Sequence, residues 1–174
     1  MDERYPIGKF EFTGEITSSV LDQWITEIER LPGLLREAVK DLDNEQLDTS
    51  YRDGGWTIRQ VIHHIADTNM NVYVRIKLTL TEENPVINPF EESKWAELPD
   101  NQLPIEVSLS LLDALHIRLG NLLRSLNPDD LNRKMTHPIT GESALISNIG
   151  FYAWHGKHHL AQITSLCNRK GWSK

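Results

Sequence analysis

The sequence lacks the features that mark several large classes of protein. Its single cysteine, Cys167, excludes an internal disulfide and any CxxC metal or redox motif. No apolar run approaches the ~18–20 residues that cross a bilayer, and the charged N-terminus lacks the apolar stretch of a signal peptide. We therefore expect a cytoplasmic protein in which Cys167 is a buried, unreactive thiol.

The sequence also lacks an excess of positive charge. Lysine and arginine number 18 against 25 aspartates and glutamates, which gives a net charge of −7 and an isoelectric point near 5.5. This balance disfavours contact with phosphate backbones and a basic membrane-surface helix, so we expect neither nucleic-acid nor membrane binding. A length of 174 residues suits a single domain, residues 1–174, with a substantial core.

Apolar residues recur at three- and four-residue steps in four segments, and no series of strands is evident. The pattern predicts helices over about residues 17–42, 58–80, 105–126 and 143–169. Pro32 and Gly33 are expected to kink the first helix or to break it in two. Four amphipathic helices predict an all-α, four-helix bundle.

The connections between the predicted helices differ in length. About 24 residues, 81–104, separate the second and third helices. Four prolines punctuate this stretch: Pro85, Pro89, Pro99 and Pro104. Such a long crossover argues against simple up-down-up-down wiring, and loops of this length often cover part of a site. The segment before the last helix, with Pro138 and Gly141, is expected to be a loop.

Seven histidines carry most of the functional signal: His63, His64, His116, His137, His155, His158 and His159. His155 and His159 are four residues apart, which places their Cβ atoms ~5–6 Å apart on one helix face. Two neutral imidazoles at that separation can bind one metal ion. His159 falls in the inward apolar stripe, where a metal would give its ring a partner. His158 is turned ~100° from His159 and is expected to face away.

The second helix offers His63 or His64 as a third ligand. His63 shares its flank with Arg59 and Lys77, which we expect to be solvated, so position on the helix favours His64. The HxxxH spacing alone is weak, since Gly156 stands where the HExxH zinc motif has glutamate. Two ordinary helix histidines remain the alternative explanation.

Other polar residues carry weaker predictions. His116 lies in the inward stripe of the third helix and is expected to be a satisfied core or pocket residue. His137 is expected at the surface or at a pocket rim. Asp67, one turn beyond His64, would either orient a ligand imidazole or be a surface carboxylate. Gln162 could line the pocket. Arg59 is expected to be solvated, with contact to an anionic substrate as the alternative.

Two blocks of the sequence resemble the DinB superfamily. Residues 55–67, GWTIRQVIHHIAD, are similar to its signature, in which a ligand histidine follows the tryptophan by eight residues and an aspartate lies three further on. This resemblance carries over as His64 and Asp67. Residues 152–162 resemble the family's HxxxH helix and carry over as His155 and His159. The YRDGGW lead-in and the WHGKHH block are similar to the YfiT branch.

The resemblance covers nearly the whole chain and implies a helical bundle with long crossovers and one three-histidine metal site. It also implies a bacterial, cytoplasmic protein, commonly a homodimer, of the kind labelled metal-dependent hydrolase. Some YfiT-like relatives are bacillithiol S-transferases. Two positions depart from the pattern: Gln60 stands where glutamate is common, and Ala161 where glycine often precedes the glutamine. Neither is a ligand position.

An open three-histidine site would leave a coordination position for water or substrate. We expect one divalent metal per chain, zinc by default and nickel as an alternative. Such a metal makes bound water acidic, with a pKa falling toward ~7, and deprotonates a bound thiol. Water or a thiol would therefore be the reacting group, with Asp67 in support. Three hypotheses follow: hydrolysis of a small substrate, transfer of a low-molecular-weight thiol, and a non-catalytic metal-binding bundle.

Overall fold

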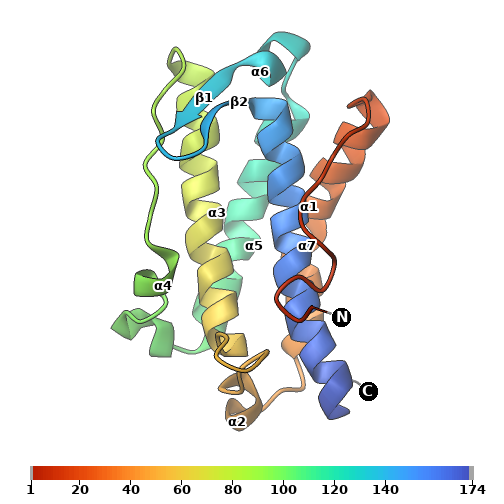
Figure 1. Cartoon of the computed structure of the whole chain (residues 1–174), viewed down its shortest axis with the longest axis vertical. Coiled ribbons are helices and arrows are strands. Elements are labelled where there is room, and N and C mark those ends of the chain that lie inside the picture. The colour runs from red at the N-terminus through yellow and green to blue at the C-terminus, as the bar shows by residue number, and fades with distance from the viewer. Residues whose placement is uncertain (1, 173–174) are drawn as a thin grey trace.

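The computed structural model describes residues 2–172, and four long helices dominate it (Figure 1). They are α1 (Ser18–Val39), α3 (Ile58–Thr81), α5 (Ile105–Arg124) and α7 (Leu145–Lys170). The four predicted helices and the all-α bundle are thus confirmed. The predicted domain limits, residues 1 and 174, lie outside the described residues. No helix within 2–172 has the length and apolar character needed to cross a membrane.

The long crossover follows from the directions of the helices. Figure 1 shows α3 and α5 running the same way, while α1 and α7 run opposite to them. A parallel pair cannot be joined by a tight turn, so the chain returns along the outside of α3 before α5 begins. This return includes α4 (Glu92–Trp95) and a 3₁₀ turn, η1 (Pro99–Gln102). The expectation that the bundle is not wired up-down-up-down is therefore confirmed.

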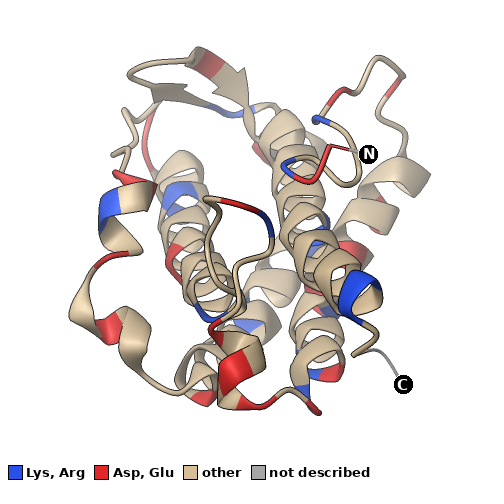
Figure 2. Ribbon diagram, turned by 60° about the horizontal axis from the view of Figure 1, so that its bottom comes forward, with Lys and Arg blue, Asp and Glu red and all other residues tan. Residues whose placement is uncertain are grey.

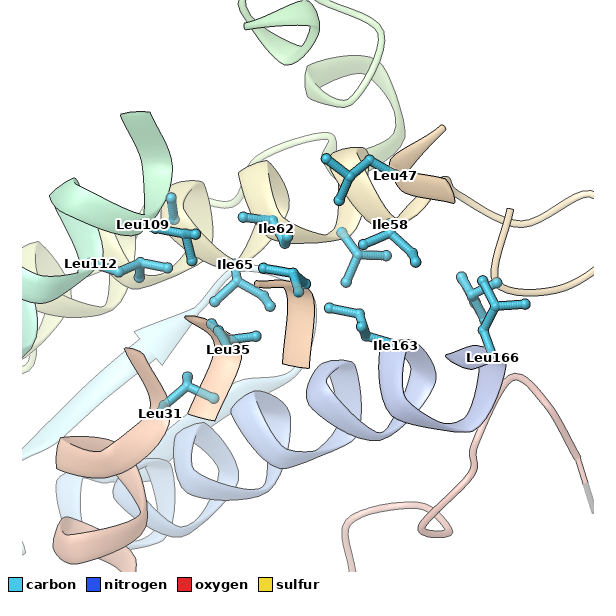
Figure 3. Packing of buried hydrophobic residues seen from close by; sticks show 14 of the residues in the cluster. Leu31, Leu35, Leu47, Ile58, Ile62, Ile65, Leu109, Leu112, Ile163 and Leu166 are labelled. Carbon is cyan, nitrogen blue, oxygen red and sulfur yellow. The ribbon is translucent and has the colours of Figure 1, made fainter. Parts of the chain in front are cut away.

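Aliphatic side chains from all four long helices meet in the core (Figure 3). Ile58, Ile62 and Ile65 from α3 face Leu35 from α1 and Ile163 from α7, and all five are fully buried. Burying each of these side chains stabilises the fold by roughly 1.5–3 kcal/mol before the cost of ordering the chain is counted. The spacing of the α3 isoleucines fixes which side of this helix points inward.

Ion pairs join α1 to α5 at the surface. Arg36 contacts Glu106 at 2.8 Å and Asp113 at 2.6 Å, and Arg124 pairs with Asp22 and Glu29. Figure 2 shows acidic and basic residues dispersed over helices and connecting segments. These exposed pairs contribute little individually, because water screens them.

The expected break in the first helix does not occur. Helix α1 is continuous through Pro32, although proline has no N–H to donate to the carbonyl of Ile28, four residues earlier. A side chain from α5 replaces the missing donor, because Nδ1 of His116 lies 2.7 Å from that carbonyl oxygen. His116 is thus a core residue, as predicted, but it is satisfied only at Nδ1, because its Nε2 is buried without a hydrogen-bond partner among residues 2–172.

The loop expected around Pro138 and Gly141 is a β-hairpin. Strands β1 (Lys134–His137) and β2 (Gly141–Ala144) pair antiparallel, with Lys134 opposite Ala144. Four residues per strand are too few for an alternating pattern to stand out in the sequence. The crossover docks on this hairpin through hydrogen bonds of 2.9 Å, from Ile87 N to Thr136 O and from Thr136 N to Pro85 O. Two further short helices, α2 (Asn44–Leu47) and α6 (Pro128–Asn132), complete the described elements.

Candidate metal centre

His64 comes to the centre from α3. This helix begins at Ile58 behind a capping box, in which Thr57 accepts from the Gln60 N–H and the Gln60 side chain accepts from the Thr57 N–H. Because the α3 isoleucines point into the core, the neighbouring flank of the helix carries His64. Its ring is buried and lies 4.6 Å, centroid to centroid, from the ring of Trp56.

His155 and His159 come from α7, one helical turn apart. Their Nε2 atoms lie only 3.2 Å from each other. Gly156 between them allows α7 to approach α1, since a Cβ at that position would lie 2.6 Å from Cδ2 of Leu31. The glycine that distinguishes this block from HExxH therefore serves helix packing, and the packing sets which way the two histidines face.

The three predicted ligands converge. One ring nitrogen from each of His64, His155 and His159 lies within 4.8 Å of the other two. The ring centroids are separated by 4.5 Å for His155 and His159, 4.8 Å for His64 and His159, and 5.5 Å for His64 and His155. Two nitrogens bound to one tetrahedral zinc at ~2.0–2.1 Å lie roughly 3.4 Å apart, so the donor spacing fits such an ion.

Gln162 determines which nitrogen of His159 is free. Its amide nitrogen lies 3.1 Å from the carbonyl oxygen of Arg4, which can only accept, so this atom donates there. The amide oxygen is then the atom 2.8 Å from Nδ1 of His159, which must carry the hydrogen. The Nε2 lone pair of His159 is thereby left facing His155. Partners of this kind orient metal-bound histidines and fix their tautomer.

Burial keeps all three rings neutral. Desolvation, followed by the charges of neighbouring histidines, lowers the pKa of His64 and of His155 to about 3. The same causes hold the pKa of His159 well below its usual value. Neutral imidazoles keep the lone pairs that metals need. The donor set therefore suits a divalent metal ion.

The expectation that Arg59 of α3 is solvated is wrong. Arg59 is not solvated, because its guanidinium is buried and contacts Asp48 at 2.7 Å. His63 is also buried, donating from Nε2 to the Leu103 carbonyl at 3.0 Å and accepting from Ser108 Oγ at 2.7 Å. His63 thus faces the end of the crossover rather than the cluster. Lys77, farther along the same flank, is exposed as expected.

His158 is expected to face away from His159, and it lies outside the three-histidine cluster. The N-terminal segment covers it, so the ring is buried. Its ring lies 5.6 Å from that of Tyr5, and its Nε2 is 3.0 Å from the Gln162 amide nitrogen. The segment is held on α7 by a hydrogen bond of 3.2 Å from Trp154 Nε1 to the Gly8 carbonyl. Sequence periodicity carries no signal for this contact.

Asp67 does not contact the three histidines. Within residues 2–172, its carboxylate makes no hydrogen bond to His64, His155 or His159. Desolvation, with a smaller contribution from Asp100, raises its pKa to about 6. Asp67 thus faces the crossover, and Gln162 is the residue that orients a ring. His137 lines a cavity, as expected for a rim residue, and Cys167 is buried, where desolvation raises its pKa.

Two cavities border the cluster, and His155 lines both. One, of about 340 Å³, is lined by all three histidines together with Tyr5 and Trp56. The other, of about 640 Å³, extends along α3 and α7 toward the hairpin. Glu92 of the crossover lines both cavities, which confirms that the long connection covers part of the site.

Comparison with known proteins places these features in a family. The sequence pattern of the DinB superfamily matches residues 27–163. A relative from Oceanobacillus iheyensis, named "putative metal-dependent hydrolase", is 63% identical over 99% of this chain and 100% of its own length. A relative of the same name from Bacillus mycoides is 58% identical over 98% of this chain and 99% of its own. The solved structure of YfiT from Bacillus subtilis, described as "a probable metal-dependent hydrolase with an unusual four-helix bundle topology", has a TM-score of 0.95, with 45% identity over 99% of this chain and 100% of that chain.

Proposed function

The chain belongs to the DinB superfamily, and from that membership we propose that it is a metal-dependent hydrolase of a small molecule. His64, His155 and His159 would hold one divalent ion. The observation that carries this proposal is the convergence of three neutral imidazoles beside two cavities. The names of the relatives support the same reaction class.

The protein's own groups prepare the site for such an ion. Burial keeps the three histidines neutral, and Gln162 holds His159 with its Nε2 lone pair toward His155. The Trp56 ring covers His64 on one side, so substrate enters from the cavities beside His155. When bound, a divalent ion supplies Lewis acidity that polarises a substrate carbonyl and favours attack by water at neutral pH.

Several finer predictions accompany this proposal. Zinc is the expected ion and nickel the alternative, since three imidazoles suit both. We expect a homodimeric, cytoplasmic, single-domain protein that binds neither nucleic acid nor membrane. Transfer of a low-molecular-weight thiol such as bacillithiol is the competing reaction, and a non-catalytic metal site is the third alternative. The ligand set itself is compatible with all three.

Metal content per chain tests the ligand assignment. Untagged protein should be purified without nickel resin and analysed by mass spectrometry beside His155→Ala and a control, His137→Gln, which removes a histidine outside the cluster. We expect about one equivalent in the parent and the control, and almost none in His155→Ala. No metal in the parent, and no uptake of added zinc or nickel, would overturn the proposal.

Product analysis separates the two reactions. A hydrolase releases acid and alcohol or amine from an ester or amide panel without consuming thiol. A transferase instead consumes one thiol for each electrophile and forms a thioether. Loss of either reaction in His155→Ala, with retention in Lys77→Met, would tie the activity to the cluster, because Lys77 is exposed and lines neither cavity.

A further inference from the structure

The larger cavity beside His155 is lined by aromatic side chains and by one arginine. Its walls include Phe90 of the crossover, Phe151 of α7 and Phe10 of the N-terminal segment, so much of the lining is aromatic. Arg75 of α3 also lines it. Arg75 follows His64 by eleven residues, which places it about 16 Å along the helix and within about 20° of the same face. Of the three histidines, His155 lines this cavity together with Arg75.

The Arg75 guanidinium is incompletely paired. One of its Nη atoms donates to the Asn88 carbonyl at 2.9 Å. Its Nε is buried without any hydrogen-bond partner among residues 2–172, and no acidic side chain forms an ion pair with it there. A buried donor of a charged group left unpaired is costly, and a planar carboxylate that accepts two parallel hydrogen bonds is the partner that best matches a guanidinium.

Tyr152 and Glu92 are the titratable side chains that interact with Arg75. Burial raises the pKa of Tyr152, and the charge of Arg75 and a hydrogen bond from it act in the opposite direction, so the hydroxyl lies beside the guanidinium in its neutral form. Desolvation raises the pKa of Glu92, and the charge of Arg75 acts in the opposite direction, so this carboxylate lies near Arg75 but forms no ion pair with it among residues 2–172. Tyr152 precedes His155 by three residues on α7, so a ligand that pairs with Arg75 beside Tyr152 can extend through the cavity to His155.

We propose that this cavity binds the substrate, and that Arg75 pairs with a carboxylate on it. The substrate class is a small carboxylic acid with an apolar or aromatic body, whose hydrolysable bond lies on the side of His155. The statement that the bond beside His155 is hydrolysed rests on the proposed hydrolase function. A monoanion fits better than a phosphate ester, because a phosphate carries a charge of about −1.5 to −2 near neutral pH and Glu92 lines the same cavity.

Binding of matched probes tests the proposal without requiring turnover. Calorimetric titration of the full chain, with its metal content measured, compares 3-phenylpropanoate with the neutral 3-phenylpropanamide. Charge-assisted hydrogen bonds predict that the acid binds about 10- to 100-fold more tightly than the amide. Equal affinities, or no binding of either probe at millimolar concentration, would overturn the proposal. The wild-type protein is sufficient for this test.

Variants then locate the carboxylate. Arg75→Gln should remove the preference for the acid while leaving affinity for the amide unchanged, and Arg75→Lys should retain part of it. Lys77→Met, which removes an exposed positive charge from the same helix, should retain all of it. Loss of the preference in His159→Ala but not in Arg75→Gln would place the carboxylate on the metal and contradict the proposal. Tighter binding of phenyl phosphate than of the acid would contradict the proposal that the substrate is a carboxylic acid.

The binding experiment can refute the substrate class without refuting the proposed function, and the reverse is also true. A metal-loaded, hydrolytic protein that does not distinguish acid from amide would retain the function and lose the substrate class. Preference for the acid that depends on Arg75, in a protein that binds no metal, would retain the carboxylate site and lose the hydrolase.

Discussion

His116 on α5 donates from Nδ1 to the carbonyl oxygen of Ile28 on α1, at 2.7 Å. That carbonyl has no helical partner because Pro32 occupies the position that would donate to it. A buried histidine thus stabilises a proline inside a helix, and the helix runs on without a break. Desolvation lowers the pKa of His116, so the ring is neutral with its hydrogen on the donating nitrogen.

The coupling between Pro32 and His116 is testable by a double-mutant cycle. His116→Leu should lower the free energy of unfolding by about 1–3 kcal/mol, because it leaves the Ile28 carbonyl buried without a donor. In a Pro32→Ala background the alanine N–H supplies that donor, so the same substitution should cost about 1 kcal/mol less. Urea unfolding measures all four proteins. Additive effects would show that the hydrogen bond does not compensate for the proline.

Gln162 should control metal affinity without binding metal. Gln162→Leu removes the acceptor for Nδ1 of His159 and should weaken zinc binding about 10- to 100-fold. Gln162→Glu keeps an acceptor and should lose much less, although it no longer donates to the Arg4 carbonyl. Competition with a chromophoric chelator measures both. Equal losses in the two variants would assign Gln162 to packing rather than to orientation of the ring.

Gly156 should be required for the approach of α7 to α1. A methyl group there would lie 2.6 Å from Cδ2 of Leu31, a side chain buried in the core, so Gly156→Ala should destabilise the fold by about 1–3 kcal/mol. Gly33→Ala is the matched control, since no atom lies within 4 Å of its added methyl group. It should stabilise α1 by about 0.5–1 kcal/mol. Thermal unfolding of both variants gives the comparison, and a neutral Gly156→Ala would contradict the packing argument.

Asp67 should make stability depend on pH near neutrality. Its pKa in the fold is raised to about 6, so the folded state binds the extra proton between about pH 4 and 6, and the associated stability is lost as pH rises through 6. Asp67→Asn should therefore stabilise the protein at pH 7.5 by roughly 1 kcal/mol, a figure reduced for solvent screening, with no gain at pH 3.5. Denaturant unfolding at both pH values tests this. A gain that is the same at both would indicate a cause other than the carboxylate charge.

Features that depend on contacts within one helix could be predicted from the sequence. The apolar period identified the four long helices, and the four-residue spacing of His155 and His159 placed both rings on one face, because helix geometry fixes such distances. Resemblance to the DinB superfamily selected His64 over its neighbour. The flank argument reached the same residue from a wrong premise, since Arg59 is buried against Asp48.

Features that depend on the docking of distant segments could not be predicted from the sequence and became visible in the folded chain. The hydrogen bond from His116 to α1, the cover of Tyr5 over His158 and the link from Gln162 to Arg4 join residues far apart in the chain. Arg75 came to share a cavity with His155 in the same way. Periodicity indicates which face of a helix or strand is buried. The residues that this face contacts depend on the packing of the whole core, and a local sequence pattern carries no information about that packing.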